Sequence, residues 1–315
     1  MRLFLNTNYI VAAALSTVLA VWAPGFAMSQ TPDPMLEASP SDLDPGGAAV
    51  AKYIYWTNSL NGTIGRANIN GTSPNQRFIP STTGGAVGGA GVTVKGQFIY
   101  WTSANGGTAK TILRAKIDGT GVIKNFITGA FNPCGITGNS THLYWAGDAG
   151  TAIGRANRNG TGVNHNLITT GTGVCGVAVT TTHIYWANYQ TSWIGRAKLD
   201  GTGVIQHFIP TNGSAFVAIR APFIYWSNFG PLAGGNSIGR ASLNGTGVNQ
   251  SFITGLNGQV NSLAADSAFI YWANWGNRGT GTTIGRAKLD GTVKNQLFIR
   301  GARGPFGIAV TGGNP

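Results

Sequence analysis

Side chains that could carry acid–base or metal chemistry are scarce in this chain. Nine acidic residues and four histidines stand against 21 lysines and arginines in 315 residues. Hydrolytic catalysis needs paired carboxylates, or a nucleophile with a base and a group that orients the base. From Lys52 onward the chain has no glutamate, and its acidic residues are Asp118, Asp148, Asp200, Asp266 and Asp290. We therefore predict no catalytic residue.

The aspartates do not gather into a site. Asp118, Asp200 and Asp290 each stand directly before a glycine, in a recurring Asp-Gly or Asn-Gly pair that is typical of tight turns. Asp148 and Asp266 lie outside this pattern and fall in different repeats. A zinc site needs three or four converging ligands, and no such spacing occurs. We predict no metal and no cofactor.

The four histidines have structural explanations. His142 and His183 stand two residues before a Tyr-Trp pair, where other repeats have Tyr or Phe, so we expect packed strand residues. His165 and His207 fall in the last strand of their repeats, which we expect at the outer edge. A Ser-His-Asp arrangement has no local signature around them.

The two cysteines occupy equivalent places. Cys134 and Cys175 each stand ten residues before the tyrosine of their repeat. Two cysteines in a secreted protein suggest one disulfide. The bond requires Cα atoms within about 7 Å, and neighbouring repeats could hold them farther apart. A disulfide and a pair of buried free thiols both stay open.

The element that positions all of these residues is a long repeat. The pair Tyr-Trp recurs at intervals of 40 to 46 residues, and Ile-Gly-Arg-Ala, or once Ile-Leu-Arg-Ala, follows each pair. A fixed period of this size indicates a repeat architecture and decides the fold. The tyrosines of the six pairs are Tyr55, Tyr100, Tyr144, Tyr185, Tyr225 and Tyr271.

Each repeat contains four short apolar runs and no helical period. The fourth repeat shows them at Gly176–Val179, His183–Trp186, Trp193–Ala197 and His207–Ile209. β-Branched and aromatic runs of this length, bounded by Gly, Asn, Thr or Pro, predict strands. Four strands per unit are typical of a β-propeller blade. We predict an all-β, six-bladed β-propeller of four-stranded antiparallel blades.

The chain ends predict how the ring closes. A further first-strand signal lies at Gly307–Val310, after the last Tyr-Trp pair, and its counterpart before Tyr53 is weak. We expect this C-terminal strand to join Tyr53–Ile79 and complete the first blade. Such a closure leaves no inner strand unpaired.

The repeat resembles a known family. Tyr55–Asn58, reading Tyr-Trp-Thr-Asn, and Ile64–Ala67, reading Ile-Gly-Arg-Ala, are similar to the YWTD (class B) repeat of the low-density lipoprotein receptor family. That family forms six-bladed propellers, and the resemblance spans about residues 47–313. Asn, Ser or Gly replaces the aspartate of the family motif, and the family's cysteine-rich modules are missing. The resemblance implies the fold without implying receptor function.

An enzymatic alternative stays open. Six-bladed calcium lactonases place Glu, Asn and Asp ligands around the channel, and Asp266 with Asn261 could supply part of such a set. The missing glutamate counts against this reading. A lyase that uses only histidine and backbone groups at the channel mouth is the other enzymatic hypothesis.

The N-terminal region has features of export. Met1–Ala27 carries Arg2, an apolar run and a small-residue end, which predict a secretory signal peptide; an uncleaved anchor is the alternative. Residues 28–46 are rich in Pro, Ser and acids and predict a disordered leader. We assign residues 47–315 to the propeller. We expect a secreted monomer, extracellular or periplasmic.

Positive charge is concentrated in the propeller. Of the 21 basic residues, 20 fall at or after Lys52, against five acids, a net charge of about +15. Such a field favours anionic partners. The arginine of each repeat is expected to stack on aromatic rings and donate to strand-end carbonyls, with a ligand-facing ring as the alternative. These residues are Arg66, Arg114, Arg155, Arg196, Arg240 and Arg286.

Loops of two kinds are expected on opposite faces. First-to-second and third-to-fourth connections are short and uniform, whereas the others vary in length and content. Variable loops can carry function without disturbing blade stacking, so we place a binding site for a protein, glycan or anionic polymer there. Each aromatic ring could instead only cap a blade. The candidate ligand-binding residues are Lys110, Phe131, Tyr189, Trp193, Phe229, Trp275, Arg278, Arg300 and Arg303.

Overall fold

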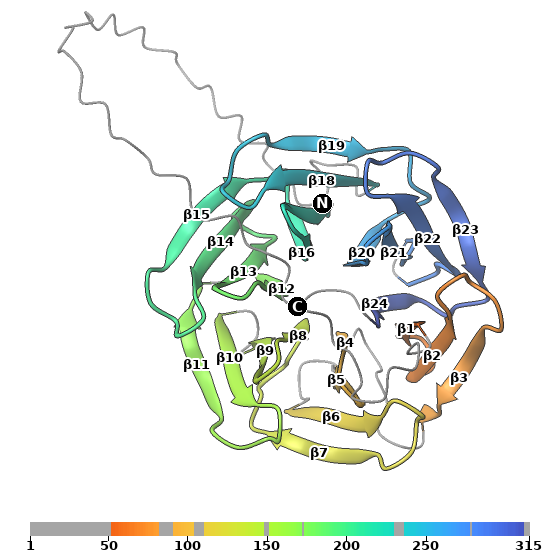
Figure 1. The fold of residues 1–315 in the computed structure, drawn as a ribbon, viewed down its shortest axis with the longest axis horizontal. Coiled ribbons are helices and arrows are strands. Elements are labelled where there is room, and N and C mark those ends of the chain that lie inside the picture. The colour runs from red at the N-terminus through yellow and green to blue at the C-terminus, as the bar shows by residue number, and fades with distance from the viewer. Residues whose placement is uncertain are drawn as a thin grey trace, which may run out of the picture. The chain divides into compact units, whose positions relative to one another are not determined.

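The fold is a closed ring of six β-sheets. The computed structural model describes residues 52–81, 91–103, 110–147, 151–171, 173–229, 236–277 and 279–311. Within these ranges the strands form six four-stranded antiparallel sheets, arranged as blades around a central axis (Figure 1). The predicted six-bladed propeller is confirmed. The predicted signal peptide and leader lie outside the described residues. Within the described ranges, no helix is long and apolar enough to span a membrane.

Each blade runs from an inner strand at the axis to an outer strand at the rim (Figure 1). We number the blades one to six in chain order. The inner strands are β24 (Pro305–Val310), β4 (Val92–Lys95), β8 (Ile136–Gly138), β12 (Val174–Val179), β16 (Ser214–Arg220) and β20 (Val260–Ala265). The second strands are β1 (Tyr53–Asn58), β5 (Phe98–Thr102), β9 (His142–Gly147), β13 (His183–Asn188), β17 (Phe223–Asn228) and β21 (Phe269–Asn274).

The remaining strands form the outer half of each blade. The third strands are β2 (Thr63–Asn68), β6 (Thr111–Lys116), β10 (Ala152–Asn157), β14 (Trp193–Lys198), β18 (Ser237–Ser242) and β22 (Thr283–Lys288). The outer strands are β3 (Asn75–Ile79), β7 (Ile123–Thr128), β11 (Asn164–Thr169), β15 (Ile205–Pro210), β19 (Asn249–Ile253) and β23 (Asn295–Arg300).

Blade one joins two distant parts of the chain. Strand β24 pairs antiparallel with β1, so that Ile308 lies opposite Trp56. The Gly307 amide donates to the Thr57 hydroxyl at 2.8 Å, and the Tyr53 amide donates to the Thr311 hydroxyl at 2.7 Å. The expected closure is confirmed, and the closing strand begins at Pro305, two residues earlier than the sequence signal.

The core lies between neighbouring blades. The tryptophan of every Tyr-Trp pair is at most 1% exposed. In five blades the indole lies over the glycine of the paired strand, as Trp186 does over Gly195, and a Cβ on that glycine would meet the ring. This close approach explains the glycine of the Ile-Gly-Arg-Ala sequence.

Tyrosine hydroxyls tie one blade to the next. Tyr55 of blade one donates to the Ile117 carbonyl of blade two at 3.3 Å, and Tyr100 donates to the Arg158 carbonyl of blade three at 3.2 Å. The same contact recurs between later blades at 3.4 Å. Burial raises the pKa of Tyr55 to about 12, so the hydroxyl stays protonated and donates.

Candidate ligand-binding face

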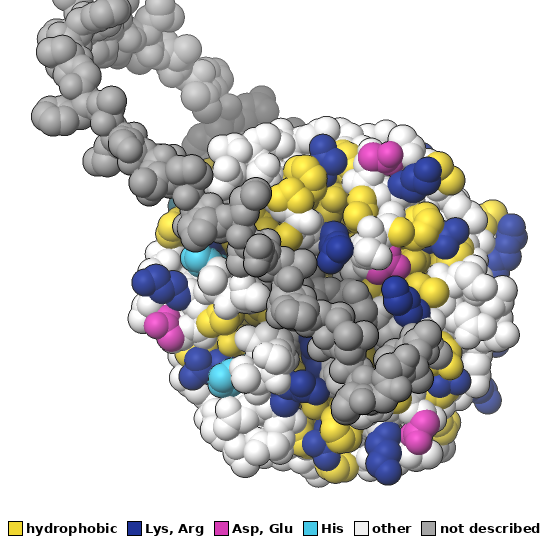
Figure 2. All heavy atoms as spheres, viewed as in Figure 1, with side chains coloured by type: hydrophobic (Ala, Val, Ile, Leu, Met, Phe, Trp, Pro, Cys, Tyr) yellow, Lys and Arg dark blue, Asp and Glu magenta, His cyan; other side chains and the backbone are white. Residues whose placement is uncertain are grey.

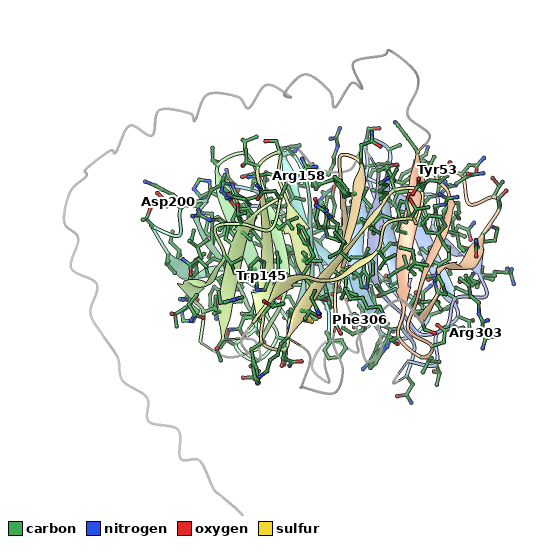
Figure 3. All side chains as sticks on the ribbon, turned by 90° about the horizontal axis from the view of Figure 1, so that it is seen from below. Tyr53, Trp145, Arg158, Asp200, Arg303 and Phe306 are labelled. Carbon is green, nitrogen blue, oxygen red and sulfur yellow. A yellow bond between two sulfur atoms is a disulfide. The ribbon has the colours of Figure 1, made fainter. Side chains whose placement is uncertain are left out.

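The propeller presents two different faces. The first-to-second and third-to-outer turns form what we call the turn face, and the remaining loops form the variable face. Figure 3 shows Tyr53, Arg158 and Asp200 on the turn face, with Arg303 and Phe306 on the opposite side.

One turn design builds the outer part of the turn face. The Asp200 carboxylate accepts hydrogen bonds from the Thr202 amide at 2.8 Å and the Thr202 hydroxyl at 2.7 Å. Gly201 between them has a φ of 91°, a conformation that favours glycine. Asp118 and Asp290 make the same contacts, and Asn makes them in the other three blades. These aspartates are therefore turn residues.

Charge is divided unequally between the faces. The four acidic residues that the structure describes, Asp118, Asp200, Asp266 and Asp290, all belong to the turn face. Figure 2 shows that face, where acidic side chains lie among lysines and arginines. On the variable face the described residues include exposed Lys110, Arg300 and Arg303 and no carboxylate. Its positive field has no local counter-charge among the described side chains.

The predicted ligand residues do not form one cluster. The Lys110 ammonium lies 5.7 Å from the Phe131 ring centroid, near the junction of blades two and three. Tyr189 is 42% exposed in the loop between β13 and β14. Trp193 instead packs on His207, with ring centroids 5.1 Å apart, at the outer edge of blade four. Arg278 lies outside the described residues.

Phe229 and Trp275 belong to an apolar group near the axis. Trp275 contacts Phe306 edge-on at 6.2 Å, and Phe306 contacts Phe216 at 5.4 Å between ring centroids. Phe229 packs against Phe216 in the same group. These rings therefore fill the variable end of the channel instead of lining an open pocket.

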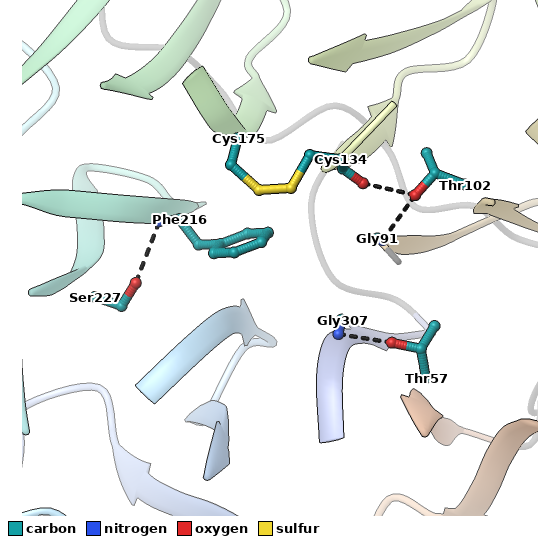
Figure 4. The surroundings of a disulfide bond; sticks show 8 residues. All are labelled: Thr57, Gly91, Thr102, Cys134, Cys175, Phe216, Ser227 and Gly307. Atoms are coloured by element: carbon teal, nitrogen blue, oxygen red, sulfur yellow. Dashed lines mark hydrogen bonds between the residues drawn. A yellow bond between two sulfur atoms is a disulfide. The ribbon is translucent and has the colours of Figure 1, made fainter. Parts of the chain in front are cut away.

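A disulfide completes this apolar group. Cys134 and Cys175 are bonded between blades three and four, with Cα atoms 5.1 Å apart (Figure 4). The Gly135 amide donates to the Cys175 carbonyl at 2.9 Å, and a Cβ on Gly135 would meet that carbonyl. Small residues here let the inner strands approach closely enough for the bond. We call the disulfide, Phe216 and Phe306 the axial plug.

The channel below the plug offers little chemistry. It encloses about 80 Å³ between the inner strands, lined mainly by small and aliphatic side chains. Among the described residues that line it, Lys95 alone has a titratable side chain. Within the described part of the chain, no three His, Cys, Asp or Glu side chains could share a metal.

Asp266 is occupied by backbone and tyrosine contacts. Its carboxylate accepts from the amides of Ala268 and Phe269 at 2.7 and 2.8 Å, and from the Tyr271 hydroxyl at 2.9 Å. Burial and then the Asp266 charge raise the pKa of Tyr271. Asn261 lies near the opposite end of β20, about 16 Å away at 3.3 Å per residue. The two side chains cannot share a calcium ion.

The histidines do not face the channel mouth. His142 and His183 begin second strands at the turn face, each with its Nδ1 near a threonine hydroxyl, at 2.7 and 2.8 Å. Burial, and then the Arg155 charge, lower the pKa of His142. His165 and His207 lie in outer strands β11 and β15. No described histidine is placed to act at the axis.

The repeat arginines stack on rings. In blade six the Arg286 guanidinium lies 4.1 Å from the Phe269 centroid and 4.0 Å from that of Phe298. Arg66, Arg114, Arg196 and Arg240 lie over rings in the same way. Arg155 differs, since Leu167 stands where other blades have Phe; it donates to the Leu199 carbonyl of the next blade at 3.1 Å.

The sequence reasoning missed one basic groove. It lies open to solvent at the junction of blades six and one, has a volume of about 410 Å³, and includes Asn61, Arg77 and Arg303 in its lining. Arg303 was a candidate, but Asn61 and Arg77 were not. Comparison of the outer strands would have flagged Arg77, because no other repeat has a permanently charged residue at that position.

Comparison with known proteins finds a family model that matches one of the repeats. Residues 268–310 match the family model of the low-density lipoprotein receptor repeat class B. Residues 268–310 form a YWTD-type (class B) repeat. A search of curated proteins by sequence gives no match.

Solved structures resemble this propeller in fold. A structure of a nidogen/laminin complex gives a TM-score of 0.64 at 17% identity, covering 82% of this chain and 98% of that chain. A streptogramin B lyase gives 0.56 at 18% identity, with 82% and 83% covered. A virginiamycin B lyase from Staphylococcus aureus gives 0.51 at 21% identity, with 70% and 73% covered. At these identities the likeness shows the fold alone.

In this propeller, asparagine gives the motif's fourth position a donor. The Asn58 amide group donates to the Thr63 hydroxyl at 2.9 Å and the Gln76 carbonyl at 3.0 Å, and its oxygen accepts from the Arg303 amide at 2.8 Å. A carboxylate could only accept. The change from aspartate therefore suits a site that must donate and accept at once.

Proposed function

We propose that this protein is a non-enzymatic extracellular binding module that holds its ligand on the variable face. The observation that carries the proposal is the uneven distribution of acidic side chains between the two faces. Exposed bases and the Phe131 ring stand on the variable face, where the described residues include no carboxylate, while the axial plug fills the channel mouth. A basic surface of this kind attracts anionic or acidic partners.

Two findings support an extracellular binding role. The class B repeat model matches residues 268–310, and one solved structure of similar fold is that of a nidogen/laminin complex. The export signal expected at Met1–Ala27 agrees with this location. N-terminal sequencing of the exported protein should give a mature chain that begins at or near Met28.

The test is a binding survey at two salt concentrations. Wild-type protein is applied to an array of glycans, acidic polymers and acidic proteins, and the variant Lys110→Ser/Phe131→Ser is compared with Lys116→Ser/Phe131→Ser. We expect binding that weakens with salt, since exposed charges are screened over about 8 Å at 0.15 M, and a greater loss when Lys110 is removed. Equal losses of binding in both variants would show that Lys110 contributes no more to binding than a lysine of the turn face.

A lyase is the second candidate, favoured by the fold shared with the streptogramin B lyase. The axial plug and the distant histidines weigh against it. Incubation with a streptogramin B substrate, followed by chromatography, should leave the substrate intact. Turnover that disappears in a His183→Ala or His207→Ala variant would establish the enzyme and overturn the binding proposal.

A further inference from the structure

The groove between blades six and one exists only because the ring closes there. Asn61 and Arg77 come from the loop before β2 and from β3, whereas Gly301 and Arg303 follow β23. More than two hundred residues separate the two sides in sequence. We call this surface, with Pro74, Asn75 and Gln76, the closure groove.

Hydrogen bonds hold both walls of the closure groove in place. The Arg303 amide donates to the Asn58 side chain at 2.8 Å, and the Ser59 amide donates to the Gly304 carbonyl at 3.0 Å. The Gln76 side chain bridges the walls by donating to the Arg300 carbonyl at 2.9 Å. The backbones that carry the two arginines are thus fixed before any ligand arrives, which lowers the entropic cost of binding.

One donor in the groove is already oriented and has no acceptor. The Asn61 oxygen accepts from the Thr63 hydroxyl at 3.0 Å, which fixes the rotation of the amide. Its nitrogen is shielded from solvent and makes no hydrogen bond within the described structure. Buried donors are nearly always paired, and a small outward movement of the Asn61 side chain would let this one meet an acceptor in the groove.

The repeat itself serves as an internal reference for Arg77. Side chains that the fold requires recur in every blade, as the stacked arginines do, but Arg77 does not recur. Its counterparts are Asn125, Asn166, His207, Ser251 and Leu297. Arg303 adds a second non-repeat guanidinium, and the described lining of the groove includes no acidic residue. The repeat fold therefore does not require an arginine at either position.

We propose that the closure groove binds the sulfate or carboxylate groups of an acidic polysaccharide. Guanidinium groups pair with such oxyanions through two parallel hydrogen bonds, and the Asn61 nitrogen supplies a further donor. The side-chain nitrogen of the neighbouring Asn75 suits a sugar hydroxyl. No aromatic ring is among the described residues that line the groove, whereas binding of single-stranded nucleic acid relies on aromatic stacking. This assignment rests on the proposed function and specifies its ligand class.

The test compares full-length variants by titration calorimetry at two salt concentrations. The probes are a sulfated heparin oligosaccharide, an oligogalacturonate that carries only carboxylates, an oligoglutamate peptide and a single-stranded DNA. Arg77→Ser/Arg303→Ser removes two charges from the groove, and Lys116→Ser/Lys198→Ser removes two from the turn face. Asn61→Asp keeps the contact with Thr63 but replaces the donor by an acceptor. Thermal melting confirms that each variant folds.

We expect the groove variants to weaken binding of at least one acidic oligosaccharide about tenfold or more. The double arginine variant should lower the slope of log affinity against log salt by about two, one for each cation removed. The heparin and oligogalacturonate arms decide between sulfate and carboxylate. The turn-face control should bind almost as wild type does.

Three results would overturn the inference. Equal weakening in the turn-face control would mean that binding follows net charge. Equal loss of peptide or DNA binding would reassign the groove to another macromolecule. Undiminished oligosaccharide binding in both groove variants, with loss in Lys110→Ser/Phe131→Ser, would remove the closure groove yet leave the variable-face function standing.

Discussion

At the scale of single residues, glycine and tryptophan share one space in each of five blades. The indole needs the room that a Cβ would take, as at Gly195 beneath Trp186. Blade two departs from this rule, because Leu113 stands opposite Trp101. In four blades the repeat arginine packs between two aromatic rings. The glycine and the arginine of the repeat are therefore both explained by contacts with aromatic side chains.

Gly195→Ala should destabilise the protein by about 1–3 kcal/mol, because the methyl group must push a fully buried ring out of place. Urea unfolding measures the change. The double variant Trp186→Phe/Gly195→Ala should cost less than the sum of the two single changes, since the smaller ring vacates that space. An unaltered unfolding midpoint in the single variant would show that the indole has another resting place.

Arg196→Ala should lower stability by about 0.5–1 kcal/mol through loss of the contact with the Phe208 ring at 4.1 Å. Arg196→Lys should recover part of this loss because it keeps the charge. Lys198→Ala, on the same strand and exposed, is the control and should be neutral. A stable Arg196→Ala variant that fails to bind ligand would instead support a ligand-facing role for the repeat arginines.

At the scale of elements, the turn between the third and outer strands has nearly the same sequence in every blade. Its Asp or Asn oxygen accepts hydrogen bonds from the threonine two residues later. In four blades a glycine stands on each side of that threonine. In blade six Val293 takes the second glycine position with a φ of 51°, and in blade one Ser73 does so with a φ of 52°. A β-branched residue in this conformation is strained.

Val293→Gly should stabilise the protein by about 1 kcal/mol, because it relieves the left-handed conformation of a residue that is 65% exposed. Differential scanning calorimetry would show a higher melting temperature. The reverse change in blade four, Gly203→Val, should lower it. Val248→Gly, at the following turn position of blade five, is the control and should give no gain.

The turn aspartates make stability depend on acid. Hydrogen bonds from threonine hold the pKa of Asp118, Asp200 and Asp290 below the usual 3.8. A depressed folded-state pKa gives stability that is complete above 3.8 and is lost as pH falls through the lower folded value. Asp118→Asn/Asp200→Asn/Asp290→Asn should therefore lose less stability between pH 5 and pH 2 in urea titrations. If the stability of the triple variant fell with pH as steeply as that of wild type, the turn aspartates would not be the source of the acid sensitivity.

At the scale of the whole molecule, two links between distant parts of the chain hold the ring together. Strand β24 completes blade one through hydrogen bonds, and the disulfide joins blades three and four near the axis. Closure removes exposed inner edges and fixes which loops become neighbours. It thereby creates the closure groove on one side and the axial plug at the centre.

Cys134→Ser/Cys175→Ser should lower stability by about 3–4 kcal/mol, because the bond restricts an unfolded chain over a separation of 41 residues. Wild-type protein unfolded with reductant should behave like the variant. The fold should persist at low denaturant in both, since strand pairing holds every blade. A variant as stable as the oxidised protein would show that the bond restricts the unfolded state very little.

The sequence by itself determined the blades and their number. Each repeat must bury both faces of its sheet against a neighbour, so the period, the turn residues and the C-terminal strand signal were enough to predict six blades and their closure. The turn role of Asp118 and its equivalents followed for the same reason. Contacts within one repeat depend on residues that are close in sequence.

Only the tertiary structure decided which residues of different blades meet. The distance between Cys134 and Cys175 depends on how closely two inner strands approach, and no spacing along the chain states it. Trp193 and Trp275 looked alike in sequence, yet one packs at the rim and the other at the axis. Arg77 and Arg303 became neighbours only when the last strand joined the first blade, because ring closure, and not the repeat, brings the two ends of the propeller together.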